Sequence, residues 1–385
     1  MSKERAQFFT EKDIESLIKE YDPQYLMLIS GRNDGKSYAA KYRALKRAIQ
    51  EHKHFIYLRR YDIDLKRVDP AQYWADFIDP EEGVNIISDL TGGEWSDISA
   101  DKGAFILSRY EGNKLIKGPM IGYIHALSVA RSYKSMQYPS VDSVLYEEFV
   151  TDGGYLYNEP AKLMQYVSTI FRRRIGRVFL VGNMISRISP YYKEWQLRGI
   201  EKMKPGQVDV YDEVMEADHF DGSLEEDTTA RIIVHIPDVI GKSSGKRSMF
   251  FGKSAGMIAG QKWDAHSQPH LKHDRRQYKD LYHVVFDSDA NARFLMTLVQ
   301  DRKHPDSVLW YVEPKTTEPQ PKTRIIGPQL VEGPYWSKDF VPLVPQEVPA
   351  FRILRLGRIA YSDDLTGTEF KRALRQVRVP ESGTD

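Results

Sequence analysis

The stretch Gly31-Arg32-Asn33-Asp34-Gly35-Lys36-Ser37 constrains the fold more than any other, because it lies between a strand pattern and a helix pattern. The apolar run Tyr25–Ile29 precedes it and predicts a buried strand. Apolar residues recur after it at helical spacing, namely at Tyr38, Tyr42, Leu45 and Ile49. A strand, a glycine-containing turn, Lys-Ser and a helix are together the context of a phosphate-binding loop.

This context predicts that the chain binds ATP with Mg²⁺. Backbone N–H groups of such a loop and the N-terminus of its helix face the same anion. Lys36 would reach the β- and γ-phosphates, and the Ser37 hydroxyl would hold the metal ion. The usual first glycine is replaced by Ser30, and Gly31 supplies a flexible residue one step later. An ordinary loop is the alternative, since Gly-Lys-Ser recurs at 241–243 and 252–254, but the strand–loop–helix context favours the first copy.

Composition excludes several classes of protein. The 385 residues suffice for two domains, and 41% hydrophobic residues supply a sizeable core. The absence of cysteine excludes disulfides and thiolate metal sites. Lys and Arg total 55 against 54 Asp and Glu, which excludes a uniformly basic surface but not a local nucleic-acid footprint. The first residues lack the apolar core of a signal peptide, and no uncharged apolar run is as long as a membrane span.

Apolar runs alternate with helical patterns over residues 1–210, which predicts an α/β domain. Its further strands are expected at Phe55–Leu58, Ala104–Leu107, Ile121–Ala126, Val144–Tyr146 and Val178–Val181. Residues 211–247 contain an acidic run and are predicted to form a small helical linker. Residues 248–385 are predicted to form a second domain. Its elements are expected to be strands at Tyr282–Phe286, Arg293–Val299 and Val308–Val312, and a last helix at Thr366–Val377 capped by Leu365 or Thr366.

The strand within Ser143–Phe149 ends in two carboxylates, Glu147 and Glu148. Acids at the carboxyl end of a strand lie where open α/β sheets bind ligands. We expect Glu147 to orient Mg²⁺ and Glu148 to accept the proton of the attacking water, because hydrolysis needs both a metal and a base. Two surface glutamates are the alternative interpretation.

Several cations and one amide are further candidates. Arg172 lies in the densest basic stretch and could act as an arginine finger on a neighbouring subunit, contact DNA phosphates, or merely end a helix. Asn183 follows a predicted strand and could orient water or sense the γ-phosphate, or form a turn. Arg59 and Arg60 close another strand and could face phosphate, as contacts with DNA or at an interface with a neighbouring subunit, whereas Lys134 by itself looks like a solvated lysine. Three loop histidines, His266, His270 and His273, are expected to be solvated rather than metal ligands.

Taken together, these segments resemble the DNA-encapsidation ATPases of podovirus-type, short-tailed bacteriophages, relatives of the large terminases. The order and spacing match over about residues 20–215, and only the first segment is diagnostic singly. Four segments carry the resemblance: Gly31–Ser37; Phe55–Tyr61; Tyr146–Phe149 with Tyr138-Pro139 upstream; and Phe171–Arg174 followed by Gly182-Asn183.

The resemblance implies an ASCE-type P-loop ATPase domain (additional strand, catalytic glutamate) followed by a smaller α+β domain that looks like a degenerate, nuclease-inactive RNase H-like fold. It implies a homo-oligomeric ring, pentameric in the family, that assembles on the capsid portal in the host cytoplasm and translocates double-stranded viral DNA. Arg172 matches the family's trans-acting arginine finger, Lys134 a lysine near the subunit interface and pore, and Glu148 the catalytic glutamate. Ser30 and Glu147 depart from the family pattern, and the role of a packaging RNA stays open.

Three rival functions remain open from the sequence. A terminase with a working nuclease would use Asp287 and Asp289, which end a predicted strand but also suit a hairpin turn. A nucleotide-binding scaffold would bind ATP without hydrolysing it. A small-molecule kinase would transfer the γ-phosphoryl group of ATP to its substrate, and DNA would not stimulate it.

Overall fold

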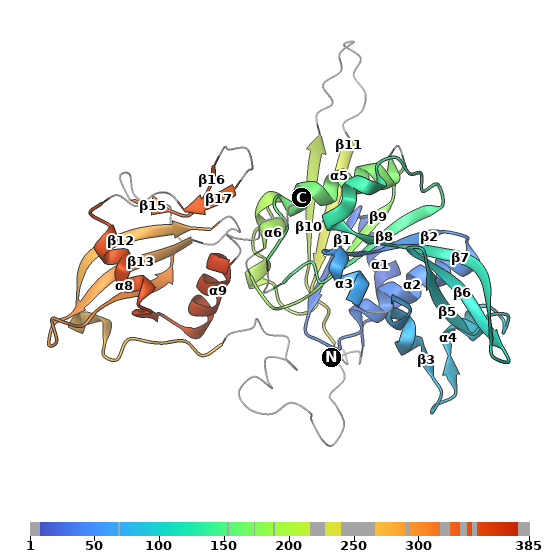
Figure 1. Ribbon diagram of the computed structural model, residues 1–385, viewed down its shortest axis with the longest axis horizontal. Coiled ribbons are helices and arrows are strands. Elements are labelled where there is room, and N and C mark those ends of the chain that lie inside the picture. Colours follow the sequence, from blue (N-terminus) through green and yellow to red (C-terminus); the bar gives the residue numbers. More distant parts are fainter. Residues whose placement is uncertain are drawn as a thin grey trace, which may run out of the picture.

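A computed structural model of the chain describes residues 8–67, 70–151, 154–172, 174–187, 189–215, 228–239, 266–288, 293–315, 324–331, 337–340 and 345–375. Described residues up to 239 form a nine-stranded sheet with its helices, the large unit. Described residues from 266 onward form a five-stranded sheet with two helices, the small unit (Figure 1). No helix in the described ranges is both long and apolar enough to cross a bilayer.

The helices and strands of the large unit follow one another along the chain in this order: α1 (Glu11–Tyr21), β1 (Tyr25–Ser30), α2 (Lys36–Gln50), β2 (His54–Arg59), α3 (Asp62–Arg67), η1 (Pro70–Phe77), β3 (Ile78–Asp79), β4 (Val84–Asn85), α4 (Ile86–Leu90), β5 (Asp97–Asp101), β6 (Ala104–Glu111), β7 (Lys114–Ala126), η2 (Leu127–Tyr133), β8 (Val141–Glu147), α5 (Glu159–Phe171), β9 (Arg177–Asn183), α6 (Pro190–Glu194), η3 (Ile200–Lys202), β10 (Val208–Met215) and β11 (Thr228–His235).

The small unit contains η4 (Arg275–Gln277), β12 (Tyr278–Asp287), β13 (Arg293–Asp301), β14 (Val308–Pro314), β15 (Ile325–Ile326), β16 (Pro328–Val331), β17 (Ser337–Phe340), α8 (Val348–Arg355), β18 (Ile359–Tyr361) and α9 (Asp364–Arg375). Its sheet has the order β15-β12-β13-β14-β18, and β16 pairs with β17 in a separate ribbon. Phe286, Phe294, Trp310 and Phe370 lie in its core. Helix α9 therefore packs one side on this core, and it lies on the side of the small unit that faces the large unit (Figure 1).

Six adjacent strands of the large sheet run parallel, in the order β11-β1-β9-β8-β2-β7. Antiparallel pairing adds β10 at one edge, and β6 and then β5 at the other. Parallel strands are joined by crossover connections, which place helices on both faces of a sheet. Because β1, β9 and β8 are parallel neighbours, their carboxyl ends meet at one end of the sheet.

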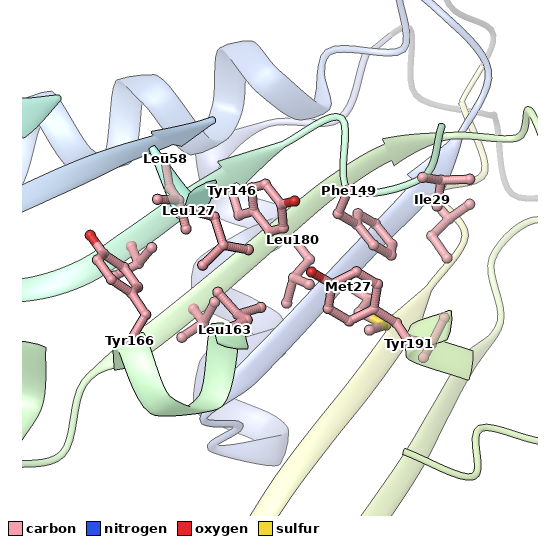
Figure 2. Close-up of a cluster of buried hydrophobic side chains, with 14 of the residues drawn as sticks. Met27, Ile29, Leu58, Leu127, Tyr146, Phe149, Leu163, Tyr166, Leu180 and Tyr191 are labelled. Carbon is pink, nitrogen blue, oxygen red and sulfur yellow. The ribbon is translucent and has the colours of Figure 1, made fainter. Parts of the chain in front are cut away.

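Successive side chains of β1 enter two different cores, as the two-residue repeat of a strand requires. Leu26 and Leu28 lie in the core that includes the buried face of α2. Met27 and Ile29 lie in the opposite core, with Tyr146 and with Leu163 of α5 (Figure 2). Both faces of β1 are therefore packed, which fixes the position of the loop that follows it.

The α/β class predicted from the sequence is confirmed, and every predicted strand is present. The predicted helical linker over residues 211–247 is wrong where the structure describes it, because 211–215 and 228–235 belong to the sheet strands β10 and β11. The last helix begins at Asp364 rather than at Thr366, and Asp363 caps it: its Oδ1 accepts the Thr366 N–H at 2.7 Å. Asp289 and most of the predicted hairpin turn lie outside the described residues. The remaining domain limits stay predictions.

Candidate active site

The loop between β1 and α2 adopts backbone conformations that its sequence makes accessible. Asn33 and Gly35 have φ of +63° and +93°, in the left-handed region that Asn and Gly tolerate best. A Cβ atom on Gly35 would lie 2.5 Å from the carbonyl oxygen of Phe9. Phe9 also donates its N–H to the carbonyl of Asp34 at 2.9 Å. The N-terminal segment thus covers the loop so closely that only glycine fits at position 35.

Lys36 lies inside this loop with 4% of its surface exposed. Its Nζ donates to the Gly31 carbonyl at 2.6 Å and lies 3.4 Å from Oδ1 of Asn183, at the end of β9. Burial lowers the pKa of Lys36 to about 8, although the nearby carboxylates of Asp34 and Glu147 oppose the shift. An anion bound beside Nζ would raise this pKa again.

Ser37 and Glu147 bring a hydroxyl and a carboxylate together at the end of β8. The Ser37 hydroxyl hydrogen-bonds to Glu147, and Tyr73 donates its hydroxyl to Oε1 of Glu147 at 3.3 Å. Burial raises the pKa of Glu147, opposed by the positive charge of Lys41 and by the Ser37 hydrogen bond. A hydroxyl and a carboxylate are oxygen donors of the kind that Mg²⁺ binds, so this pair suits the metal of a nucleotide complex.

Glu148 is exposed, with 61% of its side chain accessible. Its φ of +56° is unusual for a residue other than glycine and turns the chain away from β8. Its Oε2 accepts a hydrogen bond from Arg59 at 2.7 Å. The structure therefore places Arg59 beside Glu148 in the same chain, so the carboxylate is engaged by a cation of its own subunit.

The prediction that Arg60 faces DNA or a neighbouring subunit is wrong. The residue is 6% exposed, and its Nε donates to Oε2 of the fully buried Glu159 at 2.8 Å. Its other nitrogens donate to the carbonyls of Glu148 at 3.1 Å and Phe149 at 2.8 Å. Arg60 therefore holds the backbone that carries Glu148.

Arg172 and Lys134 are brought together on the rim of a shallow groove of about 670 Å³. Arg172 follows α5 with a φ of +52°, and its guanidinium donates to the Met136 carbonyl at 3.2 Å. None of residues 31–37 lines this groove, whose lining consists of Lys134, Met164, Gln165, Ser168, Thr169 and Arg172. Two cations that sequence reasoning considered separately thus share one exposed surface outside the loop of residues 31–37.

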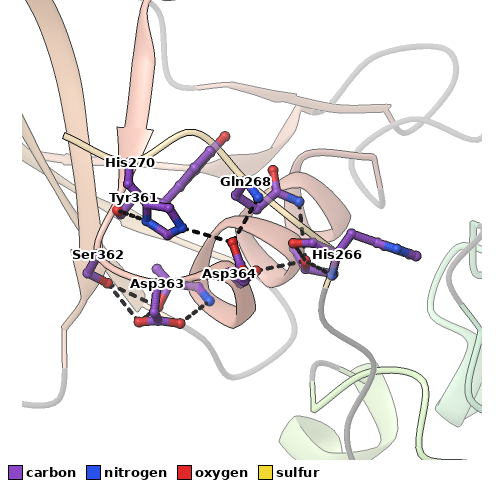
Figure 3. Close-up of polar contacts among 9 residues, drawn as sticks. His266, Gln268, His270, Tyr361, Ser362, Asp363 and Asp364 are labelled. Carbon is purple, nitrogen blue, oxygen red and sulfur yellow. Dashed lines mark hydrogen bonds and ion pairs between the residues drawn. The ribbon is translucent and has the colours of Figure 1, made fainter. Parts of the chain in front are cut away.

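His270, one of the three loop histidines expected to be solvated, hydrogen-bonds through both ring nitrogens. Its Nδ1 lies 3.1 Å from the Tyr361 carbonyl and its Nε2 lies 2.9 Å from Oδ1 of Asp364 (Figure 3). These acceptors raise the pKa of His270. In the described residues, no group of three His, Cys, Asp or Glu side chains is arranged to hold a metal ion.

Sequence reasoning missed Lys41, a buried cation one helical turn after Ser37. Its Nζ forms an ion pair with Asp76 at 2.6 Å and lies 4.7 Å from the centre of the Tyr73 ring. It is also the largest charge that opposes the raised pKa of Glu147. The available signal was its spacing of i+4 from Ser37, which places both side chains on one face of the helix.

Comparisons with known proteins agree on one family. Residues 108–265 match the family described as "Podovirus DNA encapsidation protein (Gp16)". The chain is 31% identical over 176 residues to the "DNA packaging protein" of Bacillus phage B103, covering 45% of this chain and 48% of that protein. It is 26% identical over 239 residues to the protein of the same name from Bacillus phage phi29, covering 60% and 58%. The chain thus matches about half the length of these curated relatives.

Among solved structures, the chain resembles one described as "The bacteriophage Phi-29 viral genome packaging motor assembly". The TM-score is 0.54 at 19% identity, over 97% of this chain and 100% of that chain. At this identity the likeness shows a shared fold. The resemblance to the podovirus encapsidation proteins that the sequence indicated is confirmed by the family match and by the curated relatives.

Proposed function

Because the chain is a relative of the podovirus DNA encapsidation proteins, we propose that it is an ATPase that drives double-stranded viral DNA into a preformed capsid. The observation that carries this proposal is the convergence of four side chains at the carboxyl ends of three parallel strands. Lys36 and Ser37 follow β1, Glu147 ends β8 and Asn183 ends β9. A buried lysine, a hydroxyl, a carboxylate and an amide in one place are the groups that a triphosphate and its metal ion need.

Each residue has a defined task in this proposal. Residues 31–35 and the N-terminus of α2 cradle the phosphates, and Lys36 neutralises them. Ser37 and Glu147 hold Mg²⁺, which when bound neutralises the charge that develops on the phosphate oxygens. Glu148 accepts the proton of the attacking water once its carboxylate has left Arg59, and Asn183 orients that water or senses the γ-phosphate.

The order of strands supports assignment to the ASCE class of P-loop ATPases. Strand β9 lies between β1, which leads into the phosphate loop, and β8, which carries the acids. That insertion is the additional strand from which the class takes its name. The small unit would correspond to the family's nuclease-inactive, RNase H-like domain. An active nuclease is not proposed, because Asp287 is engaged in an ion pair with Arg293 at 2.9 Å and no observation favours it.

The groove with Lys134 and Arg172 is proposed as a contact with the next subunit of a ring. A finger must project into a neighbour's site, and Arg172 is exposed on a surface separate from its own phosphate loop. Double-stranded DNA, the capsid portal in the host cytoplasm and a packaging RNA remain proposed partners, with the RNA left open. Contacts with DNA phosphates carry no sequence information, so translocation should be independent of sequence and weakened by salt.

Steady-state ATP turnover with and without linear duplex DNA tests the proposal. We expect turnover that DNA stimulates and that Glu148→Gln abolishes, while Glu148→Gln still binds ATP. No turnover by the folded wild-type protein would favour a nucleotide-binding scaffold, and turnover indifferent to DNA would favour a small-molecule kinase.

The trans role of Arg172 has a separate test by mixing of variants. Arg172→Ala and Glu148→Gln subunits are each inactive alone in this account, but a mixed ring contains interfaces with one intact Arg172 facing one intact Glu148. Hydrolysis should therefore recover in mixtures. Absence of recovery in assembled mixed rings would exclude action in trans.

A further inference from the structure

Two buried, charged side chains of helix α9 in the small unit contact the loop that follows β9 in the large unit. Glu369 and Arg372 are each 3% exposed. Glu369 accepts hydrogen bonds from the Ser186 hydroxyl at 2.9 Å and from the Arg187 N–H at 3.0 Å. Arg372 donates to the Ile185 carbonyl, and its Nη1 lies 3.7 Å from Oε1 of Glu369. The acid and the base thus bind three successive residues of one loop.

The same loop is attached at its other end to the candidate phosphate site. It begins at Asn183, whose Oδ1 lies 3.4 Å from Lys36 Nζ. Met184 donates its N–H to the carbonyl of Ser30, the residue before the phosphate loop, at 3.0 Å. Ile185 donates its N–H to the Asn183 carbonyl at 2.7 Å. Only one residue therefore separates Asn183 from the first residue that α9 holds.

Helix α9 is itself firmly anchored, so it can serve as a reference for the loop. Asp363 caps its first turn, and Phe370 lies in the core of the small unit. A strap of residues 266–270 binds its N-terminal end: Oδ1 of Asp364 accepts the Gln268 N–H at 2.8 Å, and His270 Nε2 lies 2.9 Å from the same oxygen (Figure 3). A helix fixed on both of these sides can resist movement of the loop.

We propose that Glu369 and Arg372 are positioning residues for ATP hydrolysis, which hold Asn183 in register with the γ-phosphate and make the small unit part of the catalytic apparatus. This inference rests on the proposed ATPase function. A displacement of about 1 Å at a reacting centre can lower a rate by about 10². Because the contacts bind one loop from two sides, a nucleotide-dependent shift of Asn183 must also change the contacts on α9, and the coupling is reciprocal.

The variant Glu369→Gln tests the inference with little change of volume. It removes the negative charge that faces Arg372, so the contact between α9 and the loop weakens while residues 31–37 are unchanged. We expect kcat to fall between about tenfold and a hundredfold, with the Kd for ATP within about twofold of wild type. Lys371→Gln, on the exposed face of the same helix, is the matched control and should keep the wild-type kcat. A kcat of Glu369→Gln within about twofold of wild type overturns the inference.

A double-mutant cycle with Asn183→Ala separates positioning from a general structural effect. If Glu369 acts through Asn183, adding Glu369→Gln to Asn183→Ala lowers kcat little further, whereas independent effects multiply. Multiplicative effects overturn the inference. If Glu369→Gln does not fold, as judged by circular dichroism and its Tm, Ser186→Ala replaces it. That variant removes the hydrogen bond between Ser186 and Glu369, so it should also lower kcat without changing the Kd for ATP. An unchanged kcat counts against the inference.

The outcome is distinguishable from failure of the proposed function. Wild-type protein that binds and hydrolyses no ATP refutes the function itself. Wild-type protein that hydrolyses ATP, with a kcat indifferent to Glu369→Gln and to Ser186→Ala, refutes only the positioning role.

Discussion

Replacement of Arg60 by methionine should destabilise the large unit far more than the same change at its neighbour Arg59. The Glu159 carboxylate is fully buried, and Arg60 is its only charged partner among the described contacts. Arg60→Met would leave that charge unpaired, which costs about 3–5 kcal/mol. It would also remove the donors that the carbonyls of Glu148 and Phe149 use, which places the loss near the upper end of that range.

Two further variants complete the test. Arg59→Met breaks a half-exposed pair with Glu148 and a hydrogen bond with the Tyr57 hydroxyl, so we expect a smaller loss, of about 1 kcal/mol. The double variant Arg60→Met/Glu159→Gln removes both buried charges but keeps an oxygen that can accept from the hydroxyls of Tyr146 and Tyr191, so it should recover part of the lost stability.

Urea unfolding followed by circular dichroism provides the measurement, with the free energy of unfolding compared among the four proteins. Equal losses for Arg60→Met and Arg59→Met would refute the assignment of Arg60 as a buried structural cation. A double variant less stable than Arg60→Met would refute the unpaired-charge explanation, since removal of the stranded carboxylate would then have relieved nothing.

Three smaller predictions follow from the loop and the strap. Because the pKa of Lys36 is lowered to about 8 and a bound triphosphate raises it, ATP binding at pH 8.5 should take up protons and weaken as pH rises. Calorimetry in two buffers of different ionisation enthalpy measures this uptake, which Lys36→Arg should abolish; wild-type binding without uptake contradicts the burial argument. Gly35→Ala should lower both the free energy of unfolding and the affinity for ATP, because its Cβ clashes with the Phe9 carbonyl. The control Gly112→Ala has a φ of +60° but open space around its Cβ, so it should lower the free energy of unfolding by only about 1 kcal/mol. Equal unfolding losses for the two alanine variants would argue against the clash. Because the pKa of His270 is raised in the folded protein, the stabilisation that its charged form provides is complete below pH 6.5 and is lost as pH rises through the higher folded pKa. Hydrogen exchange of residues 266–270, corrected for intrinsic rates, should therefore accelerate between pH 6 and pH 9 in the wild type but not in His270→Asn. Equal pH dependence in both proteins would show that the histidine does not fasten the strap.

The strands that leave the strongest local signal were predictable from the sequence. The run Tyr25–Ile29 is apolar and bounded by turn residues, and β1 spans Tyr25–Ser30. The turn at residues 31–35 between β1 and α2 was predictable for the same reason, because strand, turn and helix are contiguous there. A continuous apolar run is what burial on both faces of a parallel sheet requires.

Strand β10 was missed because it lies at the edge of the sheet, where it pairs antiparallel with β11, whose other neighbour is the parallel strand β1. In β10, Val208 and Val210 alternate with acids, and the acids that follow suggested a solvated linker. An edge strand needs apolar residues on one face only, so the average composition of such a stretch does not reveal that it is a strand.

The role of Arg60 could not be predicted from neighbouring residues, since its partner Glu159 is 99 positions away. The doublet Arg59-Arg60 looks like two surface cations, and only the fold shows that the first faces Glu148 while the second is buried. The contact of α9 with the loop after Asn183 spans about half the chain and carries no local signal for the same reason.

The central claim is that Lys36, Ser37 and Glu147 hold the triphosphate and its metal, with Asn183 and Glu148 beside the γ-phosphate. The most direct test is a structure of the full chain with Mg²⁺ and a non-hydrolysable ATP analogue. The account predicts a γ-phosphate oxygen within hydrogen-bond distance of Lys36 Nζ and a metal ion on the Ser37 hydroxyl. A nucleotide whose phosphates lie away from residues 31–37 would contradict it.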